Sequence, residues 1–280
     1  MNLKVYQCFY LPDQRKFLDL KSFIPYDNTP NLKPELCERP IHEKLFQNHK
    51  NDSPDTYWGL VSWKWGQKLQ YNGSFFIDWI KKNPGYDVYF IDPNMSNIAV
   101  FKNSFIKGDT TQPGILNFSQ KLLDKLEINI NLLEDGINPN ISSTCTYWVG
   151  NKKFWNKWNA FWNKCLQIIE EDPELKSFIY GYSRKTHIGQ DVINYPFVYE
   201  RFFSIFLTQE KKLKFVQYPF DSKIFHNKMV LDFIKEGKGS FVYYKLMYLI
   251  HKKILYCGDN LLVKMSDDLF GPDADRLPEF

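Results

Sequence analysis

The hydrophobic positions of this chain follow two periods, which predict alternating strands and helices. Short runs of β-branched and aromatic residues between turn-forming residues predict four strands, at 3–10, 57–63, 88–91 and 215–220. Apolar residues spaced three and four apart predict three helices, at 117–129, 152–169 and 197–207. A further short helix is expected between a cap at Ser74 and a stop at Asn83.

This order of elements favours an α/β fold, namely a Rossmann-like, mixed and mostly parallel sheet flanked by helices. Residues 22–40 contain four prolines and predict a loop without helix or strand. The aromatic stripe of the helix at 152–169 is expected to be core packing rather than a binding platform. Residues 108–114 predict a turn-rich loop that could cover a ligand.

At 280 residues the chain suits one large domain with an appendage. We expect an α/β domain at 1–235 and a C-terminal helix with an acidic tail at 236–280. The basic helix expected at 241–256 could rest on an anionic membrane or pack on the domain. The first residues lack a signal-peptide pattern, and no apolar run approaches the roughly 20 residues that span a bilayer. The expected location is the cytoplasm, with peripheral contact at the inner face of the membrane.

Composition and charge exclude several classes of function. The net charge of +4 is small and scattered, which argues against nucleic acid as a partner but suits an anionic substrate. Five widely spaced cysteines without a CxxC pair fit reduced thiols rather than disulfides or a zinc site. The phosphate-binding motifs GxGxxG and GxxxxGK[ST] and the hydrolase motif GxSxG are absent, which disfavours dinucleotide oxidoreductases, P-loop phosphotransferases and serine hydrolases.

The strand at 88–91 ends at a corner that could carry chemistry. Asp92 and Asn94 follow it, with Pro93 fixing the turn between them. Two oxygen ligands at the carboxyl end of a strand could hold Mg²⁺ or Mn²⁺ together with a diphosphate, provided that they face an open crevice. The alternative is a strand exit in which Asp92 only caps backbone amides. Asp87, at the other end of the strand, is expected to be structural.

Other candidates lie on separate elements. Glu200 could deprotonate an acceptor hydroxyl, and Asp191 is the alternative base. Arg201 could bind phosphate or form a surface ion pair. After the strand at 57–63, Trp63 could stack on a base or sugar and Lys64 could neutralise a phosphate, although burial of the tryptophan is an equal alternative.

Four motifs together resemble a family of glycosyltransferases encoded in bacterial capsule, O-antigen and lipooligosaccharide clusters. They are YWGLVSWK at 57–64, NPGYDVYF at 83–90, YWVGNKKFW at 147–155, and YPF at 195–197 followed by ERFFS at 200–204. In addition, Asp92-Pro93-Asn94 resembles the metal-binding DxD element of GT-A glycosyltransferases, with Asn as its last residue. The resemblance implies a GT-A-like sugar-nucleotide domain and places the ERFFS segment near the acceptor. It also suggests His187 as a late metal or phosphate contact and Asp109 as a substitute for an acidic residue of the family.

These observations lead us to expect a glycosyltransferase with a nucleotide-sugar donor, a divalent metal, and a glycan or lipid-linked glycan acceptor. Two alternatives stay open at this point. The first is a non-catalytic carbohydrate-binding or assembly module of a glycan pathway. The second is a metal-dependent phosphoesterase, which would need a tighter acidic cluster than the sequence contains.

Overall fold

A computed structural model describes residues 1–69, 71–93, 102–138, 141–185 and 191–218. Apart from Lys102, these residues belong to one compact unit, Met1–Pro93 with Asn103–Tyr218. The expected C-terminal extension at 236–280 lies outside the described residues. No helix in the described ranges combines the length and the apolar character needed to cross a bilayer.

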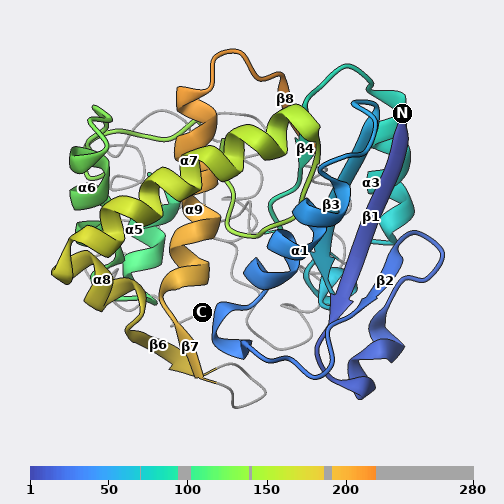
Figure 1. Ribbon diagram of the computed structural model, residues 1–280, viewed down its shortest axis with the longest axis horizontal. Helices are drawn as coiled ribbons and strands as arrows, with labels where there is room; N and C mark the ends of the chain where they lie inside the picture. Colours follow the sequence, from blue (N-terminus) through green and yellow to red (C-terminus); the bar gives the residue numbers. More distant parts are fainter. Residues whose placement is uncertain (70, 94–101, 139–140, 186–190, 219–280) are drawn as a thin grey trace, which may run out of the picture. The chain divides into compact units, whose positions relative to one another are not determined.

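A six-stranded sheet forms the centre of this unit (Figure 1). Its spatial order is β2-β1-β3-β5-β4-β8, and β5 runs antiparallel to both of its neighbours while the other pairs are parallel. The predicted α/β fold with a mixed, mostly parallel sheet flanked by helices is therefore confirmed. The strands are β1 (Asn2–Phe9), β2 (Ile24–Asp27), β3 (Thr56–Ser62), β4 (Val88–Phe90), β5 (Trp148–Asn151) and β8 (Phe215–Gln217). A separate hairpin pairs β6 (Tyr182–Lys185) with β7 (Asp191–Ile193).

Helices cover both faces of the sheet. The longer ones are α1 (Arg39–His49), α3 (Gly73–Lys82), α6 (Ile115–Lys125), α7 (Lys152–Glu171) and α9 (Tyr195–Gln209). The shorter ones are α2 (Trp65–Leu69), α5 (Ser104–Asp109) and α8 (Pro173–Ile179), with 3-10 turns η1 (Pro12–Phe17) and η2 (Pro34–Leu36). Residues of α1, α7 and α9 pack on the face that carries Trp58, Phe90 and Trp148, and α7 crosses α9 there. Trp65 of α2 contacts Tyr147 and Trp79 of α3 contacts Tyr89, on the opposite face.

The aromatic stripe of α7 is core, as the sequence predicts. Its fully buried members are Phe154, Trp155, Trp158, Trp162, Cys165 and Ile169. The indole of Trp155 stacks on that of Trp58 with ring centroids 4.0 Å apart. The N–H groups of Trp158 and Trp162 donate to the hydroxyls of Tyr199 and Tyr195 at 2.7 and 2.8 Å. Because each buried indole N–H has an acceptor, the stripe fixes α7 on α9 without an unsatisfied polar group.

Two local predictions are wrong. Residues 22–40 are not a plain loop, since they contain β2, η2 and the first two residues of α1. β2 is a largely exposed edge strand, where Pro25 is tolerated. Ser74 is not the helix cap, because α3 already begins at Gly73, whose N–H donates to the Asp19 carboxylate at 2.7 Å. That long-range carboxylate replaces a local cap and could not be found from the spacing of residues.

Candidate active site

The carboxyl edge of the sheet gathers polar residues from three neighbouring strands. Trp148 of β5 pairs with Leu60 on one side and with Phe90 on the other. Ser62 and Asp92 each lie two residues beyond these partners, so they end in line at the same edge, about 10 Å apart across two strand spacings. Because β5 runs the opposite way, the polar segment 142–146 before it also reaches this edge.

Asp92 is at the predicted corner but is buried, with 1 % of its surface exposed. One carboxylate oxygen accepts a hydrogen bond from the Thr144 hydroxyl at 2.7 Å, and the other accepts one from the Ser142 hydroxyl at 3.5 Å. The expectation that Asp92 opens directly onto a crevice is therefore not met. A cation could reach this carboxylate only by displacing groups that now contact it, the two hydroxyls among them.

Cys145 is the point where several charged groups converge. Lys68, from α2, donates a hydrogen bond to its sulfur at 3.0 Å. Burial raises the pKa of the Cys145 thiol to about 12, and the carboxylates of Glu200 and Asp92 add to this while Lys68 opposes it. Two of the predicted residues, Asp92 and Glu200, therefore influence the same atom from different elements. The thiol stays protonated at neutral pH and is a poor nucleophile.

Lys68, in contrast to the neutral Cys145 thiol, carries a charge. Its side chain is exposed, although protein groups crowd around its ammonium. This crowding by itself would lower the pKa of Lys68, but Cys145, Tyr147 and Glu200 outweigh it and raise the pKa well above the ordinary value. The ammonium also lies 5.4 Å from the centre of the Tyr147 ring. Lys68 is therefore a permanent cation at an edge that solvent reaches.

Hydrogen bonds hold neighbouring segments together at the carboxyl edge of the sheet. The hydroxyls of Tyr147 and Ser62 are 2.7 Å apart, and the Gln7 amide of β1 donates to the Ser62 carbonyl at 3.2 Å. Burial is the main reason why the pKa of Tyr147 is raised, so its phenol stays neutral. These bonds join β1, β3 and the segment before β5, and they hold the Tyr147 ring in place beneath Lys68.

Glu200 and Arg201 of α9 take different directions, as expected for neighbours about 100° apart on a helix. Glu200 is half-buried and acts electrostatically on Lys68 and Cys145. Arg201 is buried and donates to the Ser104 and Phe197 carbonyls, both at 2.8 Å, and to Gln112 at 3.3 Å. Glu200 thus belongs to the charged cluster, whereas these contacts of Arg201 hold α5 on α9.

Trp63 and Lys64 lie at the reversal point of the sheet. The chain places β2 on one side of β1 and then β3 on the other, and open α/β sheets bind ligands where the order reverses in this way. Both residues directly follow β3 and are half-buried. Trp63 contacts Phe17 at 5.6 Å between ring centroids, and the Lys64 ammonium lies 5.2 Å from the Trp63 ring. An aromatic face and a cation therefore stand at the carboxyl ends of β1 and β3.

The remaining predicted residues are not brought into this cluster by the contacts that the structure describes. Asp109 accepts hydrogen bonds from the backbone N–H groups of Gly114 and Leu116 at 2.9 and 3.1 Å, and so it caps the start of α6. Residues 108–114 are thereby tied to a helix instead of forming an open flap. Asp191 is exposed at the start of β7. Asn94 and His187 lie outside the described residues.

Asp87 occupies the opposite edge of the sheet. Its carboxylate accepts from Asn151 at 3.0 Å, from Lys153 at 2.8 Å and from the Lys214 N–H at 2.9 Å. These bonds join β4 to the neighbouring strands β5 and β8. The position and contacts of Asp87 match the structural role that the sequence predicts.

A metal ion finds few protein ligands here. The described residues contain no group of three or more His, Cys, Asp or Glu side chains that could hold one. The donors at the corner are the Asp92 carboxylate and the Ser142 and Thr144 hydroxyls, all hard oxygens. Mg²⁺ is commonly bound by one or two carboxylates and by phosphates of the substrate. The donor set therefore fits an ion that arrives with a diphosphate, and does not fit an ion held by protein alone.

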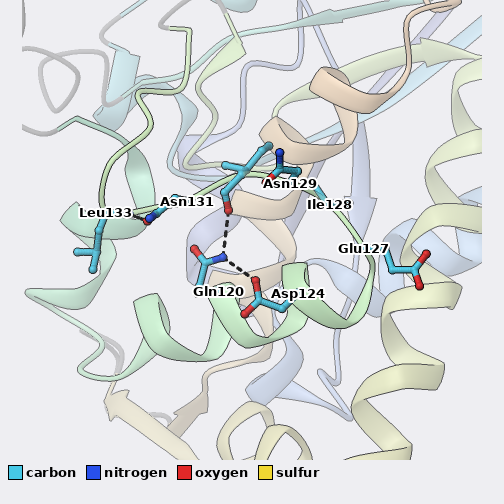
Figure 2. Close-up of a pocket in the computed structure, with 8 residues that line it drawn as sticks. Gln120, Asp124, Glu127, Ile128, Asn129, Asn131 and Leu133 are labelled. Carbon is cyan, nitrogen blue, oxygen red and sulfur yellow. Dashed lines mark hydrogen bonds between the residues drawn. The ribbon is translucent and has the colours of Figure 1, made fainter.

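A surface hollow elsewhere carries no such chemistry. It lies between α6 and the segment after it, and its lining consists of Gln120, Asp124, Glu127, Ile128, Asn129, Ile130, Asn131 and Leu133 (Figure 2). The Gln120 amide donates to Asp124 and to the Ile130 carbonyl at 2.9 and 3.0 Å, and its oxygen accepts from the Leu132 N–H. These bonds attach the segment after α6 to the helix. The hollow therefore results from how this segment packs on α6.

Sequence reasoning missed Lys68, Thr144 and Cys145. The available signal was the polar run Ser-Ser-Thr-Cys-Thr at 142–146, directly before a buried strand. Such a run marks polar groups delivered to a sheet edge in the same way as residues that follow a parallel strand. The proximity of Lys68 to Cys145 depends on the antiparallel pairing of β3 with β5, which no local pattern reveals.

The fold and the site define an α/β protein with a charged, partly open carboxyl edge. No protein-family model matches the chain, and neither a curated protein nor a solved structure matches it.

Proposed function

We propose that this protein is a GT-A-like glycosyltransferase that moves a sugar from a nucleotide-sugar donor to a glycan or lipid-linked glycan acceptor. It would act in the cytoplasm, at the inner face of the membrane. One observation carries the proposal: Lys68, Asp92 and Glu200 converge on Cys145 at the carboxyl edge of the sheet. This arrangement offers a cation for phosphate, an oxygen donor for a metal and a carboxylate base in one place.

The donor would lie along the carboxyl edge. Its base would stack on Trp63 at the carboxyl ends of β1 and β3, with Lys64 beside it, and its diphosphate would extend towards Lys68 and Asp92. When bound, Mg²⁺ or Mn²⁺ would serve as a Lewis acid that takes up charge from the departing diphosphate. Asp92, with the hydroxyls of Ser142 and Thr144, would supply the protein oxygens for that ion.

Glu200 is the proposed general base. As the bond between the anomeric carbon and the diphosphate oxygen breaks, an acceptor hydroxyl attacks that carbon and passes its proton to the Glu200 carboxylate. The electrostatic coupling of Glu200 to Lys68 supports this choice over Asp191, which no described contact links to the cluster.

Two measurements test the proposal. Calorimetric titration of the purified chain with nucleoside diphosphates, with and without Mn²⁺, should show binding of one nucleotide that the metal strengthens. Transfer assays with the matching nucleotide sugar should then lose about 10²- to 10⁴-fold in kcat in Glu200→Gln, while nucleotide affinity is retained. The exposed Glu134→Gln is the matched carboxylate control and should behave as wild type.

The proposal fails if no nucleoside diphosphate binds to the protein in the presence of any divalent metal ion. Binding of a glycan without binding of a nucleotide would instead favour the non-catalytic carbohydrate-binding module.

A further inference from the structure

Lys68 differs from the other lysines of the fold in what surrounds it. Several lysines form ion pairs with carboxylates, for example Lys4 with Asp52 at 2.9 Å and Lys157 with Glu210 at 2.8 Å. In the part of the chain that the structure describes, Lys68 forms no ion pair. Its hydrogen-bond partner is a thiol, and the group beneath it is the ring of Tyr147.

Neither of these neighbours is a carboxylate that could form an ion pair with the ammonium. Glu200 acts electrostatically on Lys68, and no ion pair between the two is described. The charge on Lys68 is therefore supported by its surroundings but is not cancelled by a direct partner.

The side chain of Lys68 lies at an exposed position. Gly66, Gln67 and Lys68 are exposed in succession along α2. The ammonium donates one hydrogen bond to the described residues and has three N–H groups, so it can donate to an incoming ligand.

We infer that Lys68 binds the diphosphate of the ligand directly, as a built-in cation that acts without a metal ion. The identity of the ligand as a nucleotide sugar rests on the proposed function, whereas the chemistry of the contact, an ammonium on a diphosphate, does not. Lys68 would then share the charge of the departing diphosphate with any ion at Asp92. Binding should persist in part when metals are removed.

Other roles for Lys68 and its neighbour Cys145 fit the structure less well. A lysine that serves as base or forms a Schiff base needs a lowered pKa, so that the free amine is populated. Here the pKa is raised, and the ammonium persists. Oxidation of Cys145 next to Lys68 is also disfavoured, because susceptibility follows thiolate character and this thiol stays protonated.

Calorimetric titration with inorganic pyrophosphate and with nucleoside diphosphates, in EDTA, tests the inference. Wild type should bind without metal. Lys68→Met should bind about ten- to a hundredfold more weakly, as expected when charge-assisted hydrogen bonds are lost, and Lys68→Arg should recover most of the affinity. Lys44→Met, at an exposed position of α1, is the matched control and should leave the affinity unchanged. Equal affinity of Lys68→Met and wild type would overturn the inference.

A second measurement covers the case in which Lys68→Met does not fold. Lysine acetylation of the wild-type chain, read by mass spectrometry, should be slower at Lys68 when pyrophosphate is present, and unchanged at Lys44. Absence of protection at Lys68 would count against the inference.

The outcomes separate this inference from the proposed function. If nucleoside diphosphates bind only with Mn²⁺ and independently of Lys68, the inference fails and the proposed function stands. If pyrophosphate binds through Lys68 but no nucleotide binds in any metal, the inference stands and the proposed function fails.

Discussion

Replacement of His42 by leucine should change how the stability of the protein depends on pH. His42 lies in α1 with 2 % of its surface exposed, and its ring stacks on Trp148 with centroids 5.9 Å apart. Neither ring nitrogen has a hydrogen-bond partner in the structure. Burial, with a smaller contribution from Arg39, lowers the pKa of His42 from 6.5 to about 3. The folded protein thus keeps this imidazole neutral where the unfolded chain would protonate it.

The sign and size of the effect follow from linkage between protonation and folding. Because the folded pKa is below the unfolded one, the stability from this group is complete above about pH 6.5 and declines as the pH falls towards 3. At pH 5 the unfolded chain gains about 2 kcal/mol from protonating His42, and the folded protein gains almost nothing. Wild type should lose this amount between pH 7.5 and pH 5, whereas His42→Leu should not.

Urea unfolding followed by tryptophan fluorescence at both pH values measures this difference. Other titrating groups contribute equally to wild type and variant, so they cancel when the two pH differences are subtracted. Ile41→Val is the control, since this core change in the same helix should cost about 1 kcal/mol at either pH. The reasoning is refuted if His42→Leu loses as much stability as wild type on acidification, which would mean that the imidazole has a stabilising partner.

Other substitutions test the packing and the site, with free energies of unfolding from urea melts. Gly59→Ala should destabilise by about 3 kcal/mol, because the new Cβ would clash with the Trp148 carbonyl oxygen and lie 2.8 Å from the Val149 side chain. Gly66→Ala should instead stabilise by about 0.5–1 kcal/mol, and equal effects of the two changes would contradict this. Arg201→Met should cost about 3 kcal/mol by leaving buried acceptors unpaired, and a neutral result would show that its hydrogen bonds are dispensable. Asp109→Ala should cost about 1 kcal/mol without weakening nucleotide binding, and a loss of binding alone would return Asp109 to the ligand site.

The elements that could be predicted from sequence are those whose local pattern agrees with their burial. The stripe at 152–169 became α7 with its apolar face inside, and the run before Asp92 became the fully buried β4. In both, the hydrophobic residues are numerous and share one periodicity, so local preference and tertiary packing point to the same structure.

β2 is an element that the local sequence pattern could not predict. Its residues, Ile24–Asp27, are mostly exposed and include a proline, and only pairing with β1 in register makes them a strand. Nothing in their own composition distinguishes them from the surrounding loop. α1, which begins within the same segment, was also missed there.

The site was predictable in part for a similar reason. Asp92 could be placed at the sheet edge because it directly follows an obvious strand. Lys68 and Cys145 are far apart in the sequence and meet only because β5 enters the sheet between β3 and β4. Whether Asp92 faces solvent was also beyond the pattern, since the hydroxyls that cover it come from the same distant segment.

The antiparallel strand also has a consequence for how the chain is made on the ribosome. β3 and β4 are synthesised well before β5, which fills the gap between them. Until Asn151 has emerged, both strands present unpaired backbone groups beside apolar side chains, the kind of surface that promotes aggregation. A nascent chain arrested before Trp148 should therefore depend on chaperones, and expression fragments should not end there.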